Sequence, residues 1–411
     1  MKNFGRLCIH LVAATALLAP FHAVPQEQPR VSPPIHGMRA MPVGSAAFPA
    51  TEGPVVPLVT TGNGITYHGG PILPFINVYL IWYGNWAGDT AQTILPDLVS
   101  NLGGSSYFSI NTTYGDSSGA NVLNAAFFAG SITDNYSQGT SLSDAAVATI
   151  VTNAMNANGG VTMNRMYIVL TSPDVMETGT GYPLYCGWHS HLSDGVTTYG
   201  WVGNPTLHGQ GCMAQAASSP NGNVGADAMA NTIVHEIDET VTDPNLNAWN
   251  NGLTAEVGDL CNFNFGSTFV VSNGSNANLT LGARNYLIQQ EWVNSGGGFC
   301  GKQLASGAVP NAPSAISPLG TATVQISSLP FTVFWSASTG AAPAWYNVCL
   351  SDDGFQSTRG CQGSTSGNAG AAVSTILFSD PSTVRVQGCN AAGCGGWSPQ
   401  SAPILYCTGE C

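Results

Sequence analysis

The 411-residue chain has few charged side chains, and basic ones are the scarcest. Lys and Arg total 9 against 22 Asp and Glu, which gives a formal net charge of −13 at neutral pH. Such a chain is a poor partner for nucleic acid or for an anionic membrane surface, because both repel acidic proteins. Since charged residues make up only 8% of the sequence, a dense cluster of them is informative, and the densest spans residues 235–243.

Long apolar runs are also missing after the N-terminus. Lys2 and Arg6 flank the start of an apolar run, Leu7–Pro20, which is followed by Phe21-His22-Ala23 and a proline-rich stretch. This pattern predicts a secretory signal peptide, residues 1–23, whose apolar core is too short to span a bilayer. Its removal leaves a net charge of about −15. The sequence therefore predicts a soluble, exported protein without a membrane span, extracellular or, if retained, periplasmic.

Several catalytic motifs are absent. No GxSxG elbow of a serine hydrolase occurs, and Gly296-Gly297-Gly298 lacks the Lys and Ser/Thr that follow the glycines of a phosphate-binding loop. No two CxxC pairs exist from which a cysteine zinc site would be built. These absences turn attention to His and carboxylate side chains.

The cysteines are expected to form disulfides, because an exported protein folds in an oxidising compartment. Cys8 lies in the signal peptide, so ten of the 11 cysteines remain, an even number. Connectivity does not follow from sequence alone. Proximity favours Cys186 with Cys212, Cys261 with Cys300, Cys349 with Cys361, Cys389 with Cys394, and Cys407 with Cys411.

Composition and periodicity divide the chain into segments. Residues 24–58 are rich in Pro and Ala and are predicted to form a leader or linker. Residues 59–303 alternate strand and helix patterns, which predicts an α/β domain with a zincin-like mixed sheet. The expected elements are a strand at Ile76–Tyr83, helices at Thr90–Leu102 and Ser141–Ala157, a strand at Met166–Thr171, and a helix at Asn223–Asp243.

A second domain follows a linker at 304–312. Residues 313–406 contain short β-rich segments between an early Trp335 and a late Trp397, which predicts an all-β immunoglobulin-like sandwich. A spacing or adhesive role suits it, since no chemical constellation stands out. Residues 407–411 form a Cys-containing tail. The expected strands are Phe331–Trp335, Trp345–Leu350, Ser374–Phe378 and Val384–Gly388.

The most informative motif is His-Glu-Ile-Asp-Glu at residues 235–239. On a helix, His235 and Glu239 share one face, about 6 Å apart at Cβ, as two metal ligands one turn apart would. The zinc-protease pattern HExxH uses this spacing, with the intervening glutamate, here Glu236, as the base that activates water. In this chain Glu239 replaces the second histidine, and zinc accepts carboxylate oxygen as well. The alternative interpretation is an ordinary solvated acidic helix face.

A catalytic zinc site needs a third protein ligand. Glu256 is the predicted third ligand, and Asp259 is predicted to orient a ligand or to replace Glu256. An equally weighted alternative is that both residues cap a loop held by the Cys261 disulfide. His189 and His191 lie on one face if their segment is a strand, so either one is a further candidate.

Seven stretches stand out together in the α/β region: Ile65–Pro71, Leu80–Asn85, Val169–Val175, Cys186–His189, Trp201–Asn204, Pro220–Met229 and Val241–Trp249. In this order they resemble the Exordium or phosphate-induced protein family over residues 64–301. The resemblance implies an extracellular or wall-associated protein and supplies no established reaction. In the C-terminal region, the run from Val384 to Ser398 resembles the closing strands of bacterial fibronectin type III domains.

Two functions are therefore expected. The first is a secreted zinc-dependent hydrolase, metallopeptidase-like, with Zn held by His235, Glu239 and Glu256, with Glu236 as general base, and with a polypeptide substrate. The second is a non-catalytic protein that binds a cell-wall or extracellular-matrix component. The two differ in whether the ligand atoms converge in space.

Overall fold

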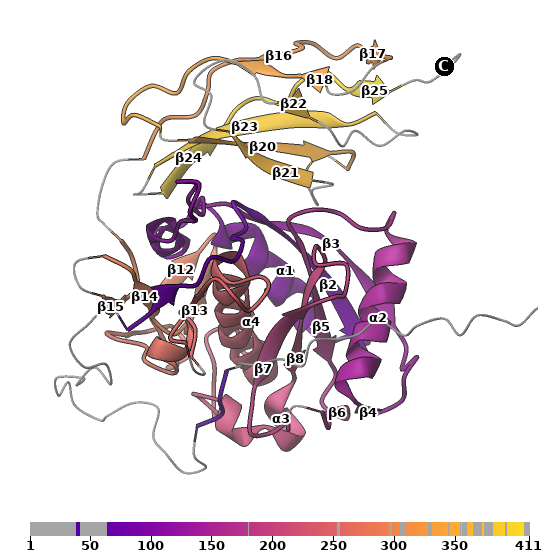
Figure 1. Ribbon diagram of the computed structural model, residues 1–411, viewed down its shortest axis with the longest axis vertical. Coiled ribbons are helices and arrows are strands. Elements are labelled where there is room, and N and C mark those ends of the chain that lie inside the picture. Colours follow the sequence, from indigo (N-terminus) through magenta and orange to yellow (C-terminus); the bar gives the residue numbers. More distant parts are fainter. Residues whose placement is uncertain are drawn as a thin grey trace, which may run out of the picture.

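The computed structural model describes residues 38–41 and 64–406, and it consists of an α/β domain and a β domain packed against it (Figure 1). Among the described residues, no helix is long and apolar enough to cross a membrane. Within the second range the description omits residues 180, 253–254, 296–297, 305–308, 328–330, 344, 354, 356–359, 365–371, 374–380 and 391–392.

The α/β domain is built on a five-stranded mixed sheet with the order β3-β2-β5-β8-β7. All neighbouring strands are parallel except β7, which pairs antiparallel with β8 at one edge. Every residue of β2, β5 and β8 is buried, as expected for strands covered on both faces. The strands are β2 (Ile76–Tyr83), β3 (Ala126–Asp134), β5 (Arg165–Thr171), β7 (Gly187–His191) and β8 (Thr198–Gly203).

Helices cover both faces of this sheet (Figure 1). Helices α1 (Ala91–Leu102) and α4 (Val224–Thr242) share one apolar core with Leu80 and Trp82 of β2. Helix α2 (Asp144–Ala157) packs on the other face with Ile81. Alternate residues of β2 thus enter opposite cores, because successive strand side chains point to opposite faces.

Local capping sets the helix boundaries. The Asn223 side chain accepts a hydrogen bond from Ala226 N at 3.0 Å and begins α4, and Ser143 caps α2 through Ala146 N at 3.2 Å. The predicted helix at Ser141–Ala157 therefore starts too early. Ser141 and Leu142 instead form the short strand β4, which pairs with β6.

Short elements complete the domain. Most are two-stranded pairs in the C-terminal part of the domain, together with single helical turns between the main elements. They are β1 (Thr66–Tyr67) with β9 (Trp249–Asn250), β4 (Ser141–Leu142) with β6 (Met176–Glu177), β10 (Phe269–Val270) with β11 (Asn276–Ala277), β12 (Leu279–Leu281) with β13 (Arg284–Tyr286), β14 (Glu291–Val293) with β15 (Phe299–Gly301), α3 (Pro205–His208), and the 3-10 turns η1 (Phe108–Thr113), η2 (Gln210–Cys212) and η3 (Asp259–Cys261).

The C-terminal domain is a β-sandwich. Its larger sheet is antiparallel with the order β21-β20-β23-β24, and its core joins Tyr346 and Val386 of this sheet to Ile316, Trp335 and Ile404 of the facing strands. The strands are β16 (Ile316–Ser317), β17 (Val324–Ile326), β18 (Phe331–Thr332), β19 (Phe334–Trp335), β20 (Trp345–Ser351), β21 (Gly360–Ser364), β22 (Ala372–Val373), β23 (Thr383–Asn390), β24 (Gly393–Trp397) and β25 (Ile404–Tyr406).

The predicted strand Phe331–Trp335 is interrupted in the structure. Its two halves, β18 and β19, pair with different partners, β22 and β16, so Val333 lies between two small sheets. The predicted strand Ser374–Phe378 lies outside the described residues.

The structure confirms four of the five predicted disulfides. Cys186 pairs with Cys212, Cys261 with Cys300, Cys349 with Cys361, and Cys389 with Cys394. Cys407 and Cys411 lie outside the described residues. The disulfides agree with folding in an oxidising compartment.

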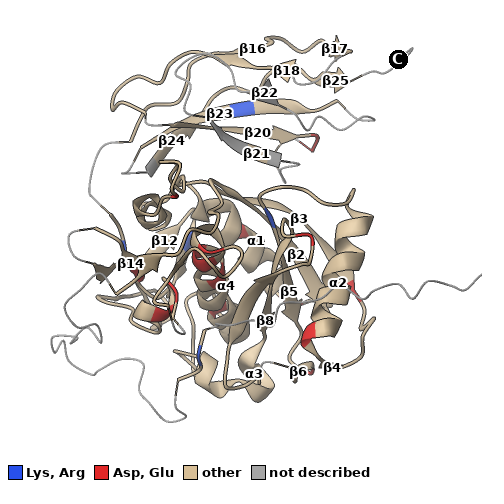
Figure 2. Cartoon of the chain, in the orientation of Figure 1, with Lys and Arg blue, Asp and Glu red and all other residues tan. Residues whose placement is uncertain are grey.

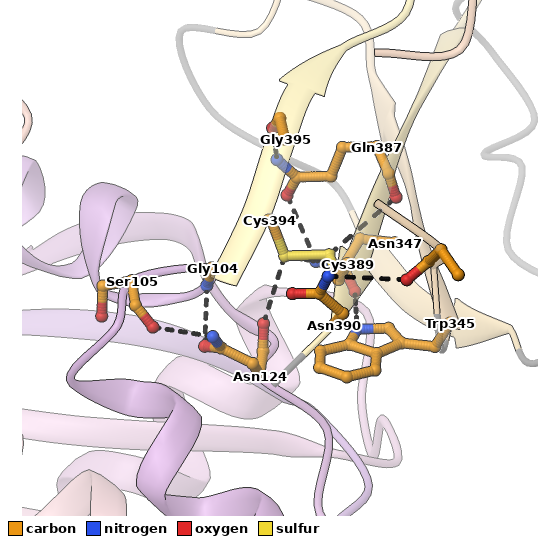
Figure 3. The surroundings of a disulfide bond; sticks show 11 residues. Gly104, Ser105, Asn124, Trp345, Asn347, Gln387, Cys389, Asn390, Cys394 and Gly395 are labelled. Atoms are coloured by element: carbon orange, nitrogen blue, oxygen red, sulfur yellow. Dashed lines mark hydrogen bonds between the residues drawn. A yellow bond between two sulfur atoms is a disulfide. The ribbon is translucent and has the colours of Figure 1, made fainter. Parts of the chain in front are cut away.

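Both sandwich disulfides lie at the contact between the domains. Cys394 N donates to Gly104 O at 2.9 Å, and the Cys394 sulfur lies 3.7 Å from Asn124 O (Figure 3). At the second point, Asn77 Nδ2 donates to Cys361 O at 3.2 Å while Asn77 Oδ1 accepts from Cys361 N at 3.1 Å. A side chain of the central strand β2 therefore forms a two-bond pair with the backbone of the sandwich.

The Asn77 pair predicts a measurable stability loss. We expect Asn77→Ala to lower the free energy of unfolding by about 1–3 kcal/mol, because it leaves the Cys361 N–H and C=O without their partner in a buried contact. Denaturant unfolding measures this, with the exposed Asn85→Ala as the control. Equal stability of the two variants would contradict the prediction.

Candidate metal centre

Helix α4 carries the HExxE residues into the interior of the domain. His235, Glu236 and Glu239 are each 0% exposed, and the acidic residues of α4 lie inside the fold in Figure 2. The interpretation of this motif as a solvated acidic face is therefore wrong. The sequence could not decide this point, because an i, i+4 spacing does not say which side of a helix meets the sheet.

The first group of candidate ligands is His235, Glu239 and Asp259. His235 Nε2 lies 3.1 Å from Glu239 Oε1 and 3.8 Å from Asp259 Oδ1, and one ligand atom of each residue falls within 4.8 Å of the other two. Asp259 begins the turn η3, and its backbone N donates to Glu239 Oε1 at 3.2 Å. The turn thus brings Asp259 to the face of α4 that the motif presents.

The second group comprises His189, Glu236 and Glu239. His189, on the edge strand β7, places Nδ1 3.4 Å from Glu236 Oε2 and 3.6 Å from Glu239 Oε2. These three residues also have ligand atoms within 4.8 Å of one another. Glu239 belongs to both groups, with one carboxylate oxygen toward each imidazole.

Glu256 has a different position from the predicted one. Its Oε1 lies 3.7 Å from Nε2 of His189, on the opposite side of that ring from Glu236 and Glu239, and it belongs to neither candidate ligand group. Asp259 occupies the place beside His235 that the sequence analysis gave first to Glu256. The reason is local: Glu256 precedes the turn η3, and its backbone N donates to Asp259 Oδ2 at 3.2 Å.

Of the two histidines in the HxH pair, only His189 reaches the cluster. His191 is partly buried, and its Nδ1 lies 3.0 Å from Leu192 O. The segment is a strand as expected, so both residues lie on one face, but His191 is the last residue of β7 and extends past the end of the cluster. His189 instead packs against the end of α4, where Asp243 O lies 3.4 Å from its Nε2.

Asp243 fixes this end of α4. One carboxylate oxygen accepts hydrogen bonds from Asn247 N at 2.5 Å and Ala248 N at 2.6 Å, and the other accepts from Asn250 Nδ2 at 2.9 Å. All its side-chain bonds therefore go to the following loop. Asp243 caps this loop, and its backbone oxygen lies beside His189 of the cluster.

Many buried polar atoms of the cluster make no hydrogen bond. They include both ring nitrogens of His235, both carboxylate oxygens of Glu256, and Oε2 of Glu236 and of Glu239. Among the described residues, no Lys or Arg pairs with these carboxylates. Buried charged groups without partners are costly, and in proteins they are paired or bind metal ions. Two imidazoles and several carboxylates form a donor set that suits a divalent cation.

The pKa values of the cluster residues are shifted because many ionisable side chains are buried close together. Burial disfavours both imidazolium forms, but Glu256 beside His189 and Glu239 beside His235 outweigh it, so both histidine pKa values rise well above 6.5. Burial raises the pKa of Glu236 and of Glu256, and burial together with Glu239 raises that of Asp259 to about 8. Glu239 differs: His235 overcomes the effect of burial and lowers its pKa below 4.5.

Sequence analysis missed a buried carboxyl pair formed by Asp238 of α4 and Glu291 of β14. Asp238 Oδ1 accepts from Asn111 Nδ2 at 2.7 Å, and burial raises the pKa of Asp238 to about 7 and that of Glu291 well above 4.5. The two carboxyls interact with one another and with Tyr107. Glu291 stands alone in the sequence, so no spacing pattern pointed to it.

Residue 258 lies against the His235 ring, and we expect this position to tolerate no side chain. A Cβ at residue 258 would lie 2.7 Å from His235 Nδ1 and 2.8 Å from its Cε1, closer than atoms pack. We therefore expect Gly258→Ala to displace the His235 ring and to lower metal affinity by at least about tenfold, as loss of a positioning contact does. Calorimetric titration with Zn²⁺ measures this. Gly396→Ala, in the sandwich, where a Cβ would make only an ordinary 3.4 Å contact with Ala312, controls for a general effect of glycine replacement.

Stability should depend on pH with a defined sign. The raised histidine pKa values contribute stability below pH 6.5 that is lost as pH rises through the folded values. The pKa of Asp259 is 3.8 in the unfolded chain and about 8 in the folded protein. This carboxyl therefore lowers the stability of the fold progressively as pH rises from 3.8 to about 8. Glu239 opposes this, but its contribution is complete above its unfolded pKa of 4.5.

We therefore expect the melting temperature of chelator-treated protein to fall from pH 5.5 to pH 8. Zn²⁺ should raise it more at pH 8 than at pH 5.5, because the cation replaces bound protons. Differential scanning calorimetry at both pH values measures this. A zinc effect that is the same at the two pH values would contradict the prediction.

Comparison with solved structures adds little. The FN1–FN3 domains of chicken CNTN1 match with 19% identity, cover 34% of this chain and 55% of that one, and give a TM-score of 0.19. A structure called FN3tt mut matches with 16% identity over 24% of this chain and 99% of its own, with a TM-score of 0.17. We draw no conclusion from scores this low, and the β-sandwich rests on its own four-stranded sheet and the strand pairs that face it.

Comparison with protein families is informative. The model of the phosphate-induced protein 1 conserved region matches residues 65–279, which include every member of the histidine and carboxylate cluster. Protein EXORDIUM-like 5 of Arabidopsis thaliana is 28% identical over 274 residues, 56% of this chain and 75% of its own length. Protein EXORDIUM-like 3 of the same plant is 28% identical over 272 residues, 56% of this chain and 80% of its own. The chain belongs to the phosphate-induced protein 1 family, which includes the Exordium-like proteins.

Proposed function

We propose that this protein is a secreted metal-dependent hydrolase that binds one zinc ion through His235, Glu239 and Asp259. The observation that carries the proposal is the position of Glu239. Its two oxygens lie 3.1 Å and 3.6 Å from nitrogens of two different histidines, and all three side chains are 0% exposed. A divalent cation at this point would neutralise buried carboxylates whose cationic partners, among the described residues, are histidines alone.

The ligand set suits zinc. One imidazole nitrogen and two carboxylate oxygens are ligands that Zn²⁺ accepts, and a catalytic zinc has three protein ligands and one open position. When bound, the ion would supply a Lewis acid that polarises a carbonyl group and makes a water molecule more acidic. The zincin-like interpretation of the α/β domain belongs to this same proposal.

Glu236 is the proposed general base. It precedes Glu239 by three residues on the buried face of α4, and burial raises the pKa of its carboxyl above 4.5, which is the direction that favours a general base. Its Oε2 lies 3.4 Å from His189 Nδ1. His189 is therefore assigned a positioning role: it contacts the base on one side of its ring and Glu256 on the other.

The competing function is a non-catalytic extracellular or wall-associated binding protein. It requires that the cluster be a structural feature of the core. The two proposals differ in metal content, and the names of the Exordium-like relatives state no reaction.

Elemental analysis of the purified protein after zinc reconstitution is the decisive test. We expect about one zinc per chain in the wild-type protein and in Glu236→Gln, and loss of zinc in Glu239→Gln, which removes a ligand charge. His191→Gln serves as the matched control, because His191 lies on β7, the strand that carries His189, but outside the cluster. Absence of zinc from the folded wild-type chain would reject the metal proposal.

Activity on unfolded protein substrates then tests the hydrolase. Glu236→Gln should retain zinc and lose activity by about 10²–10⁴-fold, the usual contribution of a general base. His191→Gln should keep its activity. Stoichiometric zinc without any hydrolysis would leave a structural metal site and favour the binding protein.

A further inference from the structure

A short segment of the predicted leader is built into the α/β domain. Residues Met38–Met41 form backbone hydrogen bonds with residues far along the chain, and Met38 is 0% exposed. Arg39 pairs antiparallel with Tyr185, Ala40 N donates to Leu184 O at 2.9 Å, and Cys186 N donates to Met38 O at 2.7 Å. Because residues 184–186 lead directly into the edge strand β7, the segment lies as an added strand at the start of that edge.

The opposite side of the segment is also held through its backbone. Met41 N donates to Gly211 O at 2.8 Å, and Asn262 Nδ2 donates to Arg39 O at 3.0 Å. A Cβ on Gly211 would come 2.4 Å from Met41 O, so a glycine is needed for this approach. Contacts to main-chain atoms on two sides define a groove that accepts an extended chain with little regard to most of its side chains.

One side chain of the segment, that of Met38, is enclosed by the domain. Met38 packs with the Cys186–Cys212 disulfide and with Phe263, and Asn231 Nδ2 lies 3.8 Å from its sulfur. Arg39, the next residue, is exposed. The groove thus has one closed apolar pocket that a long unbranched side chain fills, while the neighbouring Arg39 stays exposed with its guanidinium 5.6 Å from the centre of the Tyr185 ring.

The groove ends at the proposed base. Met38 N donates to Glu236 Oε1 at 3.4 Å, so a peptide group in the groove lies in hydrogen-bond contact with the carboxylate assigned to proton transfer. Leu184, Gly211 and Asn262 come from segments separated in sequence, and the Cys186–Cys212 disulfide ties two of these regions together.

We propose that residues 184–186, Gly211 and Asn262 form a binding groove for an extended polypeptide with a long apolar side chain, and that Met38–Met41 is the chain's own occupant. A polypeptide is then the substrate class of the proposed hydrolase, and the segment blocks the groove until it is displaced. Catalysis in this scheme rests on the proposed function. Binding of the peptide rests only on the backbone contacts and the Met38 pocket.

Peptide binding by the full-length chain tests the groove. Met38→Asp places a charge in the apolar pocket beside Glu236 and should expel the segment. Ala40→Pro removes the N–H that bonds Leu184 and should act in the same direction. The probe is a fluorescent peptide with the sequence of residues 35–42, and the control is the same peptide with Asp in place of Met38.

We expect each variant to bind the probe at least about tenfold tighter than the wild-type chain, whose tethered segment competes at a high effective concentration. The control peptide should not bind. Hydrogen exchange provides a second measurement: the Cys186 amide should exchange faster in Met38→Asp, and the probe should restore its protection. Unchanged Cys186 protection in the variant, or equal binding of both peptides, would overturn the proposal.

The two proposals can fail separately. Repeating the binding measurement after chelation should give the same affinity, since no groove contact requires a metal ion. Selective peptide binding by a chain that holds no zinc would keep the groove and reject the hydrolase. Zinc-dependent hydrolysis that is unchanged by Met38→Asp and Ala40→Pro would keep the hydrolase and reject this groove.

Discussion

The structure depends on the burial of a helix that carries ionisable groups on more than one side. Helix α4 lies in the domain core, and almost every residue from Gly225 to Thr242 is buried. Its apolar residues pack with α1 and the central sheet, while His235 and Glu239 face η3 and β7 and Asp238 faces η1 and β14. Burial of so many ionisable groups is unfavourable by itself, so the surrounding elements must supply protons, partners or a cation. The elements η1, η3, β7 and β14 around α4 carry the groups that meet this requirement.

The sequence predicts the main elements of the α/β domain because local signals mark them. The unbroken apolar run of β2 indicates a strand covered on both faces, and Asn223 and Asp243-Pro244 mark the two ends of α4. The start of α2 was misplaced, because Ser141 and Ser143 both suit a helix cap and only the pairing of β4 with β6 distinguishes them. Short strands such as β18 and β19 are harder to predict, since their partners lie far away in sequence.

The candidate site is predictable only in part. The spacing of His235 and Glu239 places them on one face at any helix orientation, so their approach follows from the sequence. The third position does not: Glu256 and Asp259 are three residues apart, and the direction of one 3-10 turn decides which carboxylate meets His235. The choice of His189 over His191 depends on where β7 ends. The docked segment at Met38 has no periodic signal, because its backbone contacts are sequence-independent.

Asp243 joins two parts of the domain that the chain otherwise keeps apart. Its carboxylate organises the loop to Asn250, which pairs through β9 with the first strand of the domain, while its backbone oxygen lies beside His189. The position of the imidazole therefore depends on the antiparallel pair of β1 and β9 as well as on the helix. A sequence change in that loop, where Asn247 is exposed, would act on the interior cluster through a single residue, so the site could change during evolution without substitution of any group inside it.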